Sequence, residues 1–219
     1  MTFHSPKIEG MFASTDIRHR AKTDFLTSYE HNCALRNALP VKYVLAGIGG
    51  DTLIADVAKI RAGDWPPLLQ SIGTASTLRV IELYSTWDGK KPVPVAHQHA
   101  NTVTRQLTCA IQQLTARRNQ LVRLSIVDMH LDLAATGELG AALSGEFCRI
   151  EVFTLRNCRI GDVGYSKLNK PIRTLTTLTT LDMSACDLSN AAIVMLTDTL
   201  RTKTLHGKWQ NRNNILNHS

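Results

Sequence analysis

The stretch CRIEVFTLRNCRIGDVG, Cys148–Gly164, carries the spacing that decides the fold. Counted from Ile150, apolar or weakly polar side chains occupy the first, fourth, sixth, ninth and eleventh places, and neither a simple helix nor an alternating strand explains this spacing. These side chains are Ile150, Phe153, Leu155, Cys158 and Ile160. The spacing is typical of a leucine-rich repeat, with the pattern LxxLxLxxN/CxL.

The same pattern recurs along the chain. LVRLSIVDMHL begins at Leu121 and LTTLDMSACDL at Leu178, so successive units start 29 and 28 residues apart. A further copy begins at Leu78 and fills the first three places with Leu78, Ile81 and Leu83. We expect a degenerate first unit to begin at Leu53, which lies 25 residues before Leu78. Because no unit buries its apolar face alone, the units must stack.

The middle of each unit is expected to be a short strand, in which alternate residues such as Leu124 and Ile126 point inward. The ninth residue then caps a sharp turn from inside. Cys158 and Cys186 occupy this place, as Met129 does in the preceding unit, so we interpret both cysteines as structural. Cys33, Cys109 and Cys148 complete an odd set without a CxxC motif, which favours reduced thiols over disulfides or a zinc site.

A helix is expected to close each unit. Helices of about 12–16 residues are typical of the ribonuclease-inhibitor-like class, an α/β solenoid with parallel strands on its concave face and helices on its convex face. Ser189 is a candidate helix N-cap, as is Asp64 in the first unit. In GDVGYSKLNKPIRTL we expect Val163 to point inward and Pro171 to break or kink the helix.

The pattern divides the chain into a flexible N-terminus (1–20), an N-terminal helical cap (21–51), the repeats (52–205) and a basic C-terminal tail (206–219). Between Leu78 and Leu121 the spacing grows to 43 residues, and the surplus TWDGKKPVPVAHQHA is expected to form a loop, either a solvated connector or a binding loop. Gly47–Thr52, GIGGDT, lacks the GK[ST] ending of a phosphate-binding loop and is expected to be a turn.

Composition is that of a globular protein, with 43% hydrophobic and 20% charged residues among 219. The net charge of +7 favours acidic partners such as nucleic acid, an anionic membrane or an acidic protein tail. The chain shows neither a signal-peptide core nor an apolar run long enough to span a membrane.

Catalytic and metal-binding patterns are lacking in the sequence. His97 and His99 have no third candidate ligand at a sequence spacing that is typical of a metal site. No Ser–His or Cys–His arrangement suggests a nucleophile. We therefore expect no enzyme activity, no metal, no cofactor and no small-molecule substrate.

Solenoids of this kind usually bind through their surfaces. The strand residues between the buried places are expected to line the concave face and to contact a protein partner. The candidate binding residues are Glu82, Tyr84, Arg123, Asp128, Arg156 and Asp182. Charges of both signs suit a protein partner better than a nucleic acid. A surface that binds nucleic acid would carry a continuous basic stripe with stacking aromatic residues.

Two N-terminal segments, Asp24–Leu45 and Lys59–Ile72, resemble the beginning of the seventy-eight-kilodalton centrosomal protein family. The shared residues are Tyr29-Glu30, Cys33-Ala34-Leu35, Asn37, Pro40, Asp64-Trp65 and Pro67-Leu68-Leu69. LRNCRIGDVG at Leu155–Gly164 is similar to a later unit of that family, as is the basic segment around Trp209. The resemblance covers roughly residues 22–212.

This resemblance implies a non-enzymatic scaffold of the centriole or ciliary basal body, located in the cytoplasm at the cytoskeleton and acting in cilium assembly. The implied partners are other centrosomal proteins and a ubiquitin-ligase assembly, and the basic charge adds tubulin's acidic tails. Two alternatives stay open: an adaptor or inhibitor of a ubiquitin-ligase complex, and an RNA-associated repeat protein. Family members continue with more repeats and a coiled coil, so the roles of those parts do not transfer.

Overall fold

The fold is a repeated strand–helix unit, seen in a computed structural model that describes residues 24–86 and 100–201. The predicted flexible N-terminus, the basic tail with Trp209, and most of the predicted loop, including His97 and His99, lie outside the described residues. The strands are β1 Ile48–Gly49, β2 Thr52–Asp56, β3 Val80–Tyr84, β4 Arg123–Val127, β5 Val152–Arg156 and β6 Thr180–Asp182. They form one sheet in sequence order, parallel from β2 to β6.

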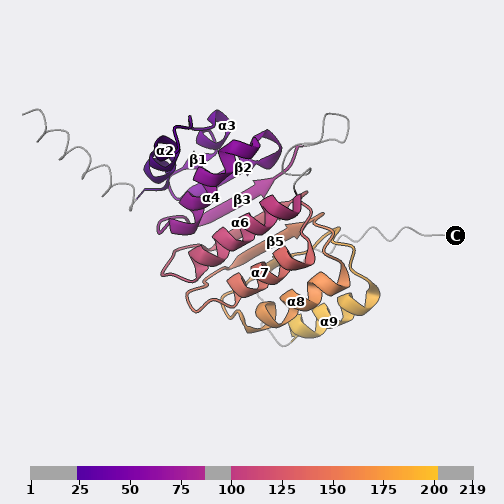
Figure 1. Cartoon of the computed structure of the whole chain (residues 1–219). Coiled ribbons are helices and arrows are strands. Elements are labelled where there is room, and N and C mark those ends of the chain that lie inside the picture. The colour runs from indigo at the N-terminus through magenta and orange to yellow at the C-terminus, as the bar shows by residue number, and fades with distance from the viewer. Residues whose placement is uncertain (1–23, 87–99, 202–219) are drawn as a thin grey trace, which may run out of the picture.

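Helices follow the strands and lie in a row over one face of the sheet (Figure 1). They are α4 Trp65–Thr74, α6 Ala100–Thr115, α7 Leu133–Leu143, α8 Gly161–Thr174 and α9 Asn190–Arg201. At the N-terminal end α2 Phe25–Leu35 packs beside α4, and α3 Lys42–Leu45 beside β2. Two short 3₁₀ turns, Val57–Lys59 and Ala62–Asp64, connect β2 to α4. No helix within the described residues is long and apolar enough to cross a membrane.

The core lies between the sheet and the helices, and the spacing of the repeats places it. Leu124 pairs with Phe153, and Phe153 pairs with Leu181, on adjacent strands, as the pattern predicts. All three side chains are at most 2% exposed. The predicted inward stripe of α6, comprising Val103, Leu107, Ile111 and Leu114, is buried as well. Stacking of one apolar row on the next stabilises units that would not fold alone.

The cysteines in the ninth place cap the turns as predicted. The Cys158 thiol donates to the carbonyl oxygen of Ile126 at 3.3 Å, and the Cys186 thiol to that of Leu155 at 3.2 Å. Each thiol therefore ties its own turn to the strand of the preceding unit. Asp128 and Asn157, which directly follow β4 and β5, and Ala185, three residues after the end of β6, have a positive φ near 55° where the chain turns toward the helix.

The first unit departs from the predicted register. Leu53 pairs with Ile81, the fourth residue of the next unit, and so does not occupy the first place with Leu78. The predicted turn in GIGGDT is confirmed, because Gly50 has φ 61° between the antiparallel strands β1 and β2.

Two helix ends differ in detail from their predictions. Ser189 caps α9 as expected, because its hydroxyl oxygen accepts from the Ala191 amide at 3.2 Å. Asp64 precedes α4 without capping it through its side chain, and it accepts instead from Arg61 at 3.0 Å.

Helix α8 corrects two further expectations. Of the predicted break or kink at Pro171, the break does not occur, since α8 continues to Thr174 and the proline falls in its last turn, where few backbone bonds follow. Val163 is 63% exposed, and Tyr165, 0% exposed, fills the inward position in its place.

Candidate protein-binding surface

The second face of the sheet is free of helices in the described residues, and we call it the open face. It consists of the outward side chains of the strands, namely Ile54, Val80, Glu82, Tyr84, Arg123, Ser125, Val127, Val152, Thr154, Arg156, Thr180 and Asp182. Because the strands are parallel and in register, these side chains form rows across the sheet. One row runs Ile54, Glu82, Ser125, Thr154 and Asp182.

Ion pairs cross the open face between neighbouring strands. Arg123 on β4 lies with its Nη1 3.4 Å from Oε1 of Glu82 on β3. Arg156 on β5 lies with its Nη2 2.7 Å from Oδ2 of Asp182 on β6. Both arginines are about half exposed, so they can still contact a partner while their direction is fixed by the carboxylates. The Arg123–Glu82 pair is exposed on both sides, and a pair of this kind contributes about 0–1 kcal/mol to stability.

Asp182 is more enclosed than a contact residue would be, with 8% exposure. Its Oδ1 accepts from the amide and the hydroxyl of Ser184, and its Oδ2 accepts from Arg156. Burial by itself raises the pKa of Asp182, but the hydrogen bonds from Ser184 and Arg156 outweigh it and lower that pKa. The carboxylate therefore positions Arg156 and contributes little contact area of its own.

The remaining predicted residues lie at the ends of strands. Tyr84 ends β3 and is 36% exposed. Asp128 follows β4, is exposed, and accepts from the Asn157 side chain at 2.7 Å. The structure thus brings five of the six predicted residues onto the open face and places Asp128 at its rim, where a partner spanning several strands would meet it.

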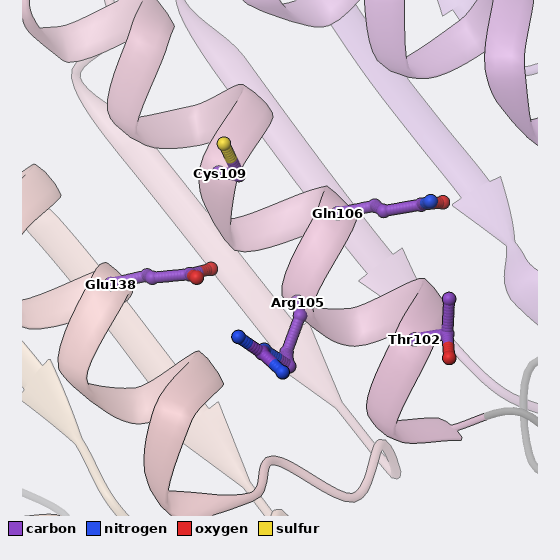
Figure 2. Close-up of a pocket in the computed structure, with 5 residues that line it drawn as sticks. All are labelled: Thr102, Arg105, Gln106, Cys109 and Glu138. Carbon is purple, nitrogen blue, oxygen red and sulfur yellow. The ribbon is translucent and has the colours of Figure 1, made fainter.

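The helical face has a shallow hollow along α6, with one lining residue from α7. It measures about 330 Å³ and is lined by Thr102, Arg105, Gln106, Cys109 and Glu138. Figure 2 shows Glu138 reaching from α7 toward α6, while Gln106 and Thr102 point to the other side of α6. Glu138 accepts from the buried Thr108 hydroxyl at 2.7 Å, which fixes one lining carboxylate. Across residues 24–86 and 100–201, no three His, Cys, Asp or Glu side chains gather as a metal site would require.

Similarity to known proteins places the chain in the context of a family. No protein-family model matches the chain. The chain is 26% identical over 192 residues to the human protein named Centrosomal protein of 78 kDa. The matched region covers 82% of this chain and 27% of that protein. The mouse protein of the same name is 24% identical over 211 residues, or 89% of this chain and 27% of its own length. The Xenopus tropicalis protein is 35% identical over 75 residues, or 34% of this chain and 10% of its own length. The family resemblance is confirmed.

Similarity to Centrosomal protein of 78 kDa thus extends over most of this chain, which spans about a quarter of the human and mouse proteins. Both the N-terminal segments and the repeat segment that suggested the family lie within the described fold. Asp64 and Trp65, for example, stand at the start of α4, where Trp65 is 1% exposed.

Sequence reasoning missed three exposed side chains beside Tyr84. They are Tyr43 on α3, Ile54 on β2 and Lys59 after β2. Residues of the strand TLIAD alternate between the two faces of the sheet. Because Leu53 pairs with the buried Ile81 and not with Leu78, its neighbour Ile54 points outward. Tyr43 carried no such signal, because α3 lies outside the repeat.

Proposed function

We propose that this chain is a leucine-rich-repeat solenoid of the ribonuclease-inhibitor-like class that serves as a non-enzymatic scaffold at the centrosome. The repeated register of β2 to β6 supports the repeat assignment. The 21–51 segment is then the cap of the first unit, because α2 packs on α4 and α3 on β2. The name carried by the similar proteins supports the centrosomal location.

The open face carries this proposal, because it is the large surface that the helices leave uncovered. Its mixed charges, half-exposed arginines and one tyrosine suit a protein partner. We infer that it binds another centrosomal protein and so contributes to the assembly of the cilium at the centriole or basal body. A ubiquitin-ligase subunit, as partner of an adaptor or inhibitor, would use the same face.

Charge distribution argues against the RNA-associated alternative. Residues 24–86 and 100–201 hold sixteen Lys and Arg against fifteen Asp and Glu, a net charge of +1. Six of the seven net positive charges therefore belong to residues outside the described fold. A polyanion following the sheet would meet Glu82 as well as Arg123, and no continuous basic stripe is present on the open face.

Imaging of a fluorescently tagged chain in ciliated cells tests the proposal. We expect the tag to coincide with a centriole marker, and the Arg123→Glu and Arg156→Glu double variant to lose this signal while keeping its helical circular dichroism. The helix-face variant Arg105→Glu is the matched control and should stay at the centriole. A diffuse or ribosomal signal for the unaltered chain would contradict the proposal.

A further inference from the structure

The elements α3, β2 and β3 lie at the N-terminal end of the sheet, far from α9 (Figure 1), and each carries one exposed apolar side chain. Ile54, Tyr84 and Tyr43 are 39%, 36% and 47% exposed. Ile54 pairs with Glu82, two residues before Tyr84, so Ile54 and Tyr84 lie diagonally across adjacent strands on the same face of the sheet. Scattered single apolar residues are normal on a surface, whereas a group on adjacent elements marks an interaction site.

Two ammonium groups accompany the aromatic rings. Lys42 Nζ lies 4.9 Å and Lys59 Nζ 5.1 Å from the centroid of the Tyr43 ring, within cation–π range. Lys59 is also held by Asp56, which pairs with Tyr84 across the strands β2 and β3. It therefore connects Tyr43 on α3 with Tyr84 on the sheet, and the side chains form one patch.

A buried carboxylate fixes the position of Lys59. Asp56, 5% exposed, has its Oδ2 3.1 Å from Lys59 Nζ. The same carboxylate accepts from the Thr86 hydroxyl at 2.5 Å and from the Ala58 amide at 3.1 Å. Lys59 is thus held in place before any partner arrives, which lowers the entropy cost of binding. Lys42 forms no ion pair with any residue that the structure describes.

We propose that Tyr43, Ile54 and Tyr84, flanked by Lys42 and Lys59, form a docking patch for an acidic peptide segment that carries one apolar side chain. This rests on the proposed function, because it names the part of the open face where the protein partner is anchored. The three apolar side chains receive the apolar residue, and the two ammonium groups select carboxylates beside it. Tyrosine is one of the residue types that dominate binding energy in protein interfaces.

Other occupants fit the patch less well. A second copy of the chain, docked face to face, would bring two basic patches together, and like charges oppose such an interface. Single-stranded RNA that stacks on the tyrosines is an alternative occupant that the binding experiment distinguishes.

Selection from a random peptide library displayed on phage, against the purified full chain, tests the patch. We expect the enriched peptides to be acidic with an aromatic or aliphatic residue. Their affinity should fall roughly tenfold or more for Tyr43→Ala, Tyr84→Ala and Lys42→Glu. Both tyrosines are exposed, so these variants should fold. The control Val194→Ala removes a 61% exposed apolar residue from α9 and should bind as the unaltered chain does.

Three results would overturn the patch. One is enrichment of peptides without acidic residues, and another is equal binding to the patch variants. The third is preferential binding of a single-stranded RNA oligonucleotide that Tyr84→Ala abolishes. Peptides sensitive to Arg156→Glu but not to Tyr43→Ala would overturn the patch and leave the proposed function standing. Peptides insensitive to every open-face variant would count against both.

Discussion

Arg156 on β5 donates a 2.7 Å hydrogen bond to Asp182 on β6, and the carboxylate is the more buried partner. Because hydrogen bonds from Ser184 and Arg156 overcome the effect of burial, the folded-state pKa of Asp182 lies below its ordinary value. The stabilisation from this carboxylate is therefore present above the unfolded-state pKa and is lost as the pH falls through the folded-state pKa.

We expect Asp182→Asn to lower the free energy of unfolding by roughly 1–3 kcal/mol at neutral pH, because one charged acceptor of three hydrogen bonds is lost. The difference from the unaltered chain should shrink on acidification, when Asp182 is protonated in both states. Urea unfolding at several pH values measures it. Asp198→Asn on the exposed side of α9 is the control, and a difference independent of pH would contradict the assignment.

The contact between α7 and α8 depends on Gly140. A Cβ at this position would lie 2.8 Å from the Lys167 carbonyl oxygen and 3.5 Å from Cγ of Pro171. Because Pro171 has no N–H to bond that carbonyl, α7 approaches it closely. We expect Gly140→Ala to destabilise the fold by roughly 1–3 kcal/mol in thermal or urea unfolding.

Gly137 on the same helix is the matched control for Gly140. An added Cβ there meets nothing within 4 Å, so Gly137→Ala should be neutral or stabilise by up to about 1 kcal/mol through helix propensity. Equal effects of the two substitutions would show that the helices are not packed as described.

Thiol reactivity should follow the capping role of the cysteines. Burial raises the pKa of Cys186 to about 11 and raises the pKa of Cys158 further, and both thiols are 0% exposed. Cys109 on α6 is half-buried. Iodoacetamide should therefore label Cys109 in the native chain and Cys158 and Cys186 only after unfolding, as read by peptide mass spectrometry. Early labelling of Cys158 would contradict its placement.

Phe153 is the middle rung of the apolar row, between Leu124 and Leu181. We expect Phe153→Ala to cost roughly 3–5 kcal/mol in denaturant unfolding, because it leaves a cavity shared by two interfaces between units. The neighbouring Thr154 points to the open face, and Thr154→Ala should cost less than 1 kcal/mol. Similar costs for the two variants would reverse the assignment of the faces.

The sequence predicted the rungs of the sheet because buried places recur with a fixed spacing. Leu124, Phe153 and Leu181 stack for that reason, and the cysteines after β5 and β6 cap their turns. The same logic failed at β2, where only part of the pattern is present and TLIAD allowed a shift of three residues.

Features outside the repeat could not be predicted in this way. Tyr43 meets Lys59 because a short helix before the first unit packs on β2, and no periodicity specifies that contact. Asp182 was expected to be exposed by its place in the strand. It is instead 8% exposed, and its carboxylate accepts hydrogen bonds from Ser184, two residues beyond the strand, and from Arg156.

Proximity labelling in a ciliated cell tests most directly whether the open face holds this chain at the centrosome. The chain, its Arg123→Glu and Arg156→Glu double variant, and the control Arg105→Glu would each be fused to a biotin ligase and expressed at equal levels. We expect the unaltered chain and the control to label centrosomal proteins, and this labelling to fall at least several-fold for the double variant. Equal labelling of centrosomal proteins by all three fusions, or by none, would contradict it.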